Sequence, residues 1–315
     1  MIGLDPYWAD LLTYVGISII VALGVQVTMT SGQLHSAGAA FMGLSGYAAA
    51  YLTAALGVPL PVAAVLGIAV SSVVAFIIGT AIVRLDTWFF ALATLGLGQV
   101  FVIVFDNADA VGGAAGYSDL PITTTLPEVL VILVLIVILL ARYQNSELAQ
   151  ACRAVAEDPL AAAASGIPVL RTRLIAFTFG STICGIGGSL YVFYAGYIRP
   201  SSMDFLHSLN FLVYVALGGQ GTWLGPMLGA TVLVVGPELL RFSDTYRFML
   251  YGLLLMVITI LRPRGLLIRR PIGTPLRDAL MEDLTRSPLS RVVRQFGWDR
   301  AGAAGRAVGM RSDAR

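Results

Sequence analysis

No Asp, Glu, Lys or Arg occurs between Asp10 and Arg84, a stretch of 73 residues. Further stretches without these residues cover 87–105, 174–198 and 205–237. A soluble core does not produce runs this long, because each of its helices needs a wet face. Segments of about 20 apolar residues match a hydrocarbon layer of about 30 Å. The runs also lack the period-two alternation of a membrane β-barrel. The sequence therefore predicts an all-α, polytopic transmembrane helical bundle.

About nine membrane segments can be placed, with the N-terminus outside and the C-terminus in the cytoplasm. They lie near 8–29, 35–56, 60–83, 87–105, 127–142, 171–195, 206–218, 225–240 and 246–261. The segments 206–218 and 225–240 are short, and a glycine-rich stretch from Gly218 to Pro226 separates them. It is either a broken or re-entrant helix beside a transport path or a tight cytoplasmic turn between two helices.

The arginines divide the chain into two regions. All 20 basic residues are arginine, and residues 262–315 hold 12 of them against 5 acidic residues, a net charge of +7. Basic segments beside membrane helices stay in the cytoplasm, and we expect this one to contact the membrane lipid surface and not nucleic acid. We therefore expect a membrane domain over 1–261, with a cytoplasmic loop at 143–172, and a basic cytoplasmic tail over 262–315. The N-terminus carries Asp5 and Asp10 and no basic region, which indicates a retained first helix and not a cleaved signal.

Several function classes find no support in the residues. Without lysine the chain cannot carry a Walker A phosphate loop or form a Schiff base. The charge-free runs hold no intramembrane carboxylate or arginine, which argues against a gradient-driven secondary transporter. His35 and His207 stand apart without zinc-ligand spacing, and Cys152 and Cys184 suggest neither a metal site nor a disulfide. We therefore expect no enzyme, no metal and no cofactor. We expect instead a gated transport path whose energy comes from a separate protein.

A short polar segment at 151–167, called the island below, is the candidate site at which a separate ATPase acts on this chain. Asp158 is a good N-cap, Pro159 suits the first helical position, and the alanines that follow favour helix. Gly166 can adopt the left-handed conformation that ends a helix. About two turns of helix, marginal alone, would need a partner surface. We therefore predict a cytoplasmic docking helix; the alternative is a solvated connector.

Five sequence blocks together resemble the permease subunits of branched-chain amino acid ABC importers, in the LivM-like branch, over roughly 10–268. The blocks are Ser31–Leu34 with Ala39–Gly43, Ala93–Gly98, Val111–Gly116, the island at 151–167, and Leu217–Gly219 through Gly229–Ala230; the end pieces Pro237–Arg241 and Arg262–Leu267 fit as well. The resemblance rests on their order and separations.

The resemblance implies a permease that works with a second permease subunit, two ATP-binding-cassette ATPases and an extracytoplasmic solute-binding protein in the bacterial inner membrane. It implies that the island contacts the ATPase, with Glu157, Asp158, Gly166 and Ile167 at the motif positions. With Arg153 and Pro159, which lie in the same island, these form the expected ATPase-coupling set. The usual substrates are branched-chain amino acids, with urea, amides or another small solute as the alternative.

Several departures from the family pattern concern the substrate. The histidine of the first block lies earlier than in relatives, at His35. Gln99 stands where relatives usually have an acidic residue, and Val111 and Ala115 stand where relatives usually have polar residues. The candidate path residues are polar groups near apolar spans, each of which could equally form a helix–helix hydrogen bond. They are Gln33, His35, Thr94, Gln99, Asn210 and Gln220.

Overall fold

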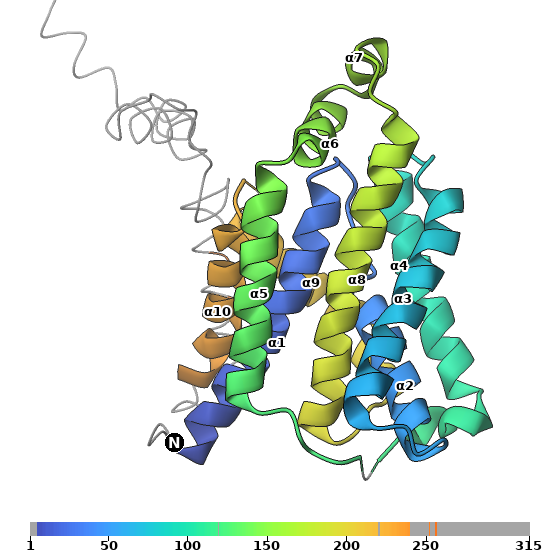
Figure 1. Ribbon diagram of the computed structural model, residues 1–315, viewed down its shortest axis with the longest axis vertical. Helices are drawn as coiled ribbons and strands as arrows, with labels where there is room; N and C mark the ends of the chain where they lie inside the picture. Colours follow the sequence, from blue (N-terminus) through green and yellow to red (C-terminus); the bar gives the residue numbers. More distant parts are fainter. Residues whose placement is uncertain (1–4, 119, 220, 240–251, 253–255, 257–315) are drawn as a thin grey trace, which may run out of the picture. The chain divides into compact units, whose positions relative to one another are not determined.

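A computed structural model describes residues 5–118, 120–219, 221–239, 252 and 256. Its elements are helical (Figure 1) and comprise α1 (Pro6–Met29), α2 (Gly38–Ala54), α3 (Leu60–Ile82), α4 (Thr87–Asp106), η1 (Asp109–Val111), η2 (Gly113–Ala115), α5 (Leu126–Gln144), α6 (Glu147–Glu157), α7 (Pro159–Ala164), α8 (Val169–Ala195), η3 (Pro200–Met203), α9 (Phe205–Gly218) and α10 (Leu224–Leu239). The segment predicted at 246–261, apart from Gly252 and Met256, and the tail at 262–315 lie outside the described residues.

Five of these helices, α1, α3, α4, α5 and α8, are long and apolar enough to cross a membrane. Helices α9 and α10 begin and end within a residue of the predicted segments. The segment predicted at 35–56 was wrong at its start and two residues too long at its end. Helix α2 begins at Gly38, and the residues from Ser31 to Ala37 are not helical.

Helix α8 lies at the centre of the described bundle and packs against α1, α2 and α3 (Figure 1). Small residues allow these backbones to approach closely. A Cβ atom added to Gly24 of α1 would lie 2.6 Å from the carbonyl oxygen of Gly180 and 2.9 Å from the backbone nitrogen of Cys184. Gly180 and Cys184 therefore form the close α1–α8 crossing together with Gly24.

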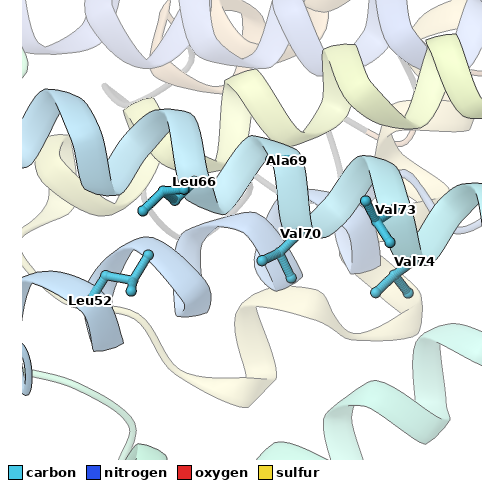
Figure 2. A pocket seen from close by; sticks show the side chains of 6 residues that line it. All are labelled: Leu52, Leu66, Ala69, Val70, Val73 and Val74. Atoms are coloured by element: carbon cyan, nitrogen blue, oxygen red, sulfur yellow. The ribbon is translucent and has the colours of Figure 1, made fainter.

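Helices α3, α4 and α5 lie at the margin and expose aliphatic side chains. In the most apolar part of α1, 83% of the residues are buried, against 17% in α4. An open groove of about 390 Å³ lies between α2 and α3. Figure 2 shows the residues that line it, which are Leu52, Leu66, Ala69, Val70, Val73 and Val74. These side chains offer no hydrogen bond, so the groove suits hydrocarbon and not a polar solute.

Helices α9 and α10 form an antiparallel hairpin. Gly229 lies against the carbonyl oxygen of Tyr214, and Gly218 lies against Gly225. The loop between the helices lies beside α1, because the Gln26 side chain donates a hydrogen bond to the Thr222 carbonyl oxygen (2.8 Å). A turn between two helices of 14 and 16 residues fits both interpretations of the glycine-rich stretch at 218–226, which stay predictions.

Candidate functional site

The island at 151–167 forms the end of α6 and all of α7, at one end of the bundle (Figure 1). Asp158 separates the two helices and caps α7. Its Oδ1 accepts hydrogen bonds from the backbone nitrogens of Leu160 (2.8 Å) and Ala161 (3.1 Å). These bonds satisfy two of the free N–H groups of the first turn. The predicted cap is present.

Gly166 ends α7 with a φ of +85°. Its N–H donates to the carbonyl of Ala163, and the N–H of Ile167 donates to the carbonyl of Ala162, both at 3.0 Å. This pair of bonds is a Schellman motif, which needs a left-handed residue at the glycine position. A Cβ atom on Gly166 would meet nothing within 4 Å. The glycine is therefore set by backbone conformation and not by crowding.

Most of the predicted coupling residues are exposed at this end. Glu157, Asp158, Pro159 and Gly166 are exposed, and Leu160 of α7 has 82% of its surface exposed. Ile167 and Arg153 are half-buried. Arg153 donates a hydrogen bond to the carbonyl oxygen of Gln144 (3.2 Å), which ties α6 to the end of α5. Arg153 thus supports the island, whereas α7 is its free surface.

Residues 31–37, between α1 and α2, are not helical, and this segment is called the break below. After Gly32, whose φ is +79°, the chain turns back along α1 before α2 begins. A Cβ atom on Gly38 would lie 2.6 Å from Val25 Cγ2, so α2 begins beside α1, about one turn short of the end of α1. A membrane tolerates irregular backbone only where protein or a water-filled cavity surrounds it. His35 and Ser36 are accordingly buried.

Three candidate path residues meet at this break: Gln33, His35 and Thr94. Gln33 Nε2 donates to the carbonyl oxygen of Val83 (3.2 Å), and the Ser36 N–H donates to Thr94 Oγ1 (3.2 Å). The His35 ring lies among aromatic side chains, 5.1 Å from the Phe177 ring and 5.8 Å from the Phe41 ring between centroids.

The break holds polar atoms that lack partners. Among the described residues, both His35 ring nitrogens and Gln33 Oε1 are buried without a hydrogen bond. Each such atom costs about 1–3 kcal/mol unless water or another conformation satisfies it. The break therefore combines buried irregular backbone with unsatisfied polar groups.

The island and the break are in contact. A Cβ atom on Gly32 would lie 2.9 Å from Ala156 Cα of α6, so the two backbones touch directly. Cys152 of α6 lies 3.4 Å from the Tyr143 hydroxyl, and burial raises the pKa of its thiol against the opposing hydrogen bonds of Tyr143 and Thr30. A displacement of α6 would therefore also move Gly32 at the start of the break.

Two other candidate path residues do not join this cluster. Gln99 on α4 and Asn210 on α9 are exposed, and Gln220 lies outside the described residues. Sequence reasoning missed Ser36, Phe41 and Phe177. Phe41 and Phe177 look like ordinary membrane-helix residues, and only the position of His35 inside a charge-free run could have pointed to an aromatic environment.

Comparisons with known proteins agree on one family. The family model described as branched-chain amino acid transport system / permease component matches residues 7–259. The high-affinity branched-chain amino acid transport system permease proteins LivM of Salmonella typhimurium and Escherichia coli are each 28% identical, over 82% of this chain and 69% of the relative. The high-affinity branched-chain amino acid transport system permease protein LivH of Salmonella typhimurium is 28% identical over 52% of this chain and 54% of its own. No solved structure matches the chain.

Proposed function

The chain belongs to the family of permease components of branched-chain amino acid transport systems, and we propose that it is the transmembrane permease subunit of an ABC importer for branched-chain or other hydrophobic amino acids. Its family consists of membrane permeases and not of enzymes. The proposed partners are a second permease subunit, two ATPase subunits and an extracytoplasmic solute-binding protein, in the inner membrane of a bacterium. The likeness to both LivM and LivH supports a permease pair.

We further propose that α7 is the segment that the ATPase moves. The observation that carries this proposal is the contact between Gly32 and Ala156, which joins the exposed island to the break. A capped helix can transmit a rigid displacement. Movement of α7 would pass through α6 to the residues after α1, and from there to His35. The ATPase would thereby bias the conformation of the break.

The break is the proposed part of the solute path within this subunit. Gln33, His35 and Thr94 would face the solute when the chain opens, because the unpaired Gln33 Oε1 and His35 nitrogens would gain partners there. Gln99 and Asn210 are exposed polar side chains on apolar helices, a placement that costs free energy in lipid. A second permease covering them would remove that cost, so they remain candidates for a path shared between two subunits, as does Gln220.

The test is uptake into proteoliposomes that hold this chain with its partner permease, ATPases and binding protein. ATP-dependent leucine uptake is expected, and none without ATP. Uptake that follows an ion gradient without ATP would refute the importer class. A complex that hydrolyses ATP but moves no leucine would refute the amino-acid substrate, and urea and small amides would then be tested in the same vesicles.

A further inference from the structure

We propose that a second pocket, at the end of the bundle away from α7, is where a net-neutral aliphatic amino acid first binds this subunit. The residues that line it come from α1, α2, α8, η3 and α9. They are Tyr14, Ile17, Ser18, Met42, Tyr191, Ser202, His207 and Phe211, and this set is called the distal pocket below. The assignment of the ligand rests on the proposed function.

The position of the distal pocket follows from the helices that build it. Helix α8 begins beside α7 and ends at Ala195, so Tyr191 lies near its far end. His207 is in the first turn of α9, and 51% of its side chain is exposed, which places it at the rim. Phe211, one turn further along α9, is only 6% exposed and forms the floor.

The floor separates the distal pocket from the break. A Cβ atom on Gly38 would lie 3.9 Å from Phe211 Cβ, and Gly38 is the first residue of α2 after the irregular backbone. Phe211 therefore lies between the distal pocket and the segment that holds His35. A solute bound in the distal pocket would have to displace this ring to reach Gln33 and His35.

The lining suits a ligand with two kinds of surface. Ile17, Met42 and Phe211 offer apolar contact, whereas the other members carry hydroxyl groups or an imidazole. Tyr14 forms a hydrogen bond with Ser18, and Tyr191 forms hydrogen bonds with Ser202 and with Tyr197, which lies outside the lining. A ligand that donates and accepts hydrogen bonds can exchange with these pairs at little net cost.

The absence of full charges in the lining selects the ligand's net charge. None of the described residues that line the distal pocket is an Asp, Glu or Arg, and His207 Nδ1 already lies 2.8 Å from the Asp204 carboxylate. A cationic or anionic side chain would lose its hydration without a counter-charge. A zwitterion with an aliphatic side chain carries no net charge and matches the apolar members. The chemistry thus favours leucine-like solutes over lysine or glutamate.

The described conformation is closed. The hollow measures about 20 Å³, which is room for a single water molecule. An amino acid enters only if α9 shifts relative to α1 and carries Phe211 with it. The hairpin with α10 makes such a shift possible as one unit, because the close glycine contacts join α9 to α10.

The first experiment is substrate protection of a single introduced thiol. S202C is compared with S201C, whose position is exposed and outside the lining; the parent, whose Cys152 and Cys184 are buried, serves as the blank. The assembled complex in proteoliposomes is treated from outside with an impermeant thiol reagent. Leucine delivered by the binding protein should slow labelling of S202C about 5-fold or more and leave S201C unchanged.

A second measurement separates binding in the pocket from a distant conformational effect. F211L enlarges the floor and should raise uptake of phenylalanine relative to leucine by about 10-fold, the scale on which a small change in an apolar pocket discriminates. S18A should raise the KM for leucine by about 3- to 10-fold, the worth of one neutral hydrogen bond.

The outcomes keep the two proposals apart. If leucine uptake is normal but S202C is unprotected and F211L leaves the preference unchanged, the distal pocket is wrong and the proposed function stands. If S202C is protected by urea or an amide and not by leucine, the pocket stands and the amino-acid substrate is wrong. Protection by lysine or glutamate equal to that by leucine would overturn the neutral-ligand argument.

Discussion

Replacing Gly166 with valine tests whether the shape of α7 couples ATP hydrolysis to transport. The φ of +85° at Gly166 lies in the left-handed region, where an L-residue costs about 1–2 kcal/mol and a β-branched residue more. Nothing lies within 4 Å of the added Cβ atom, so the whole effect is backbone strain. A cost of this size lowers the population of the closed Schellman turn about 5- to 30-fold. We expect more ATP hydrolysed per leucine transported, measured in proteoliposomes.

Two further variants isolate the cause. Gly166→Asn keeps a residue that tolerates the left-handed conformation and should retain most of the coupling. Gly57, in the turn between α2 and α3, also has a positive φ (+63°) and open space around it. Gly57→Val should therefore lower stability by a similar amount without changing the ratio of ATP to leucine. Normal coupling in Gly166→Val, or equal uncoupling in both valine variants, would refute the argument.

The other predictions concern the core, the break and a thiol. Gly24→Ala should lower the free energy of unfolding in detergent by about 1–3 kcal/mol, because the added atom meets the α8 backbone. The control is Gly96→Ala on α4, where the added atom meets nothing within 4 Å, and it should be neutral or stabilising by up to about 1 kcal/mol. Equal losses of stability in the two variants would argue against close packing of α1 on α8. His35→Leu should raise the unfolding temperature, since it removes two unpaired buried nitrogens, yet slow leucine uptake; unchanged uptake would remove His35 from the path. The Cys152 thiol, whose pKa burial raises, should react with an alkylating agent at pH 8 more slowly than an exposed cysteine and speed up as the pH rises; fast labelling at pH 8 would contradict its placement.

Hydropathy placed most of the described helices because their signal is local. The predicted apolar segments correspond to seven helices whose ends differ from prediction by only a few residues, and the cap of α7 followed from Asp158, Pro159 and Gly166 alone. The start of α2 was misplaced because the run from 11 to 83 is equally apolar on both sides of the break. Hydropathy measures the preference of a residue for lipid or water, and it cannot distinguish a helix from buried irregular backbone at the same depth.

The same reasoning explains why the sequence could not show which of the six candidate path residues come together. Gln33 and His35 are two residues apart, but Thr94 joins them only because α4 passes beside the break, a contact between residues 58 positions apart. Gln99, one and a half turns further along α4, points outward. Polarity inside an apolar run indicates that a side chain needs a partner, whereas the face of the helix decides whether that partner lies within this chain.

Asp158 and His35 represent two opposite solutions for a polar group in this protein. The Asp158 carboxylate accepts two backbone N–H groups at an exposed turn, so that its conformation is well determined. The His35 ring lies among phenylalanines with both nitrogens unpaired in the described structure, so that a competing conformation needs to supply only a few hydrogen bonds to match it. A rigid helix such as α7 can switch the protein between states only if it acts on an element with two conformations of similar free energy. The contact of Gly32 with Ala156 joins the well-determined island to the poorly satisfied break, and this placement is the physical reason to expect motion at the break and not within α7.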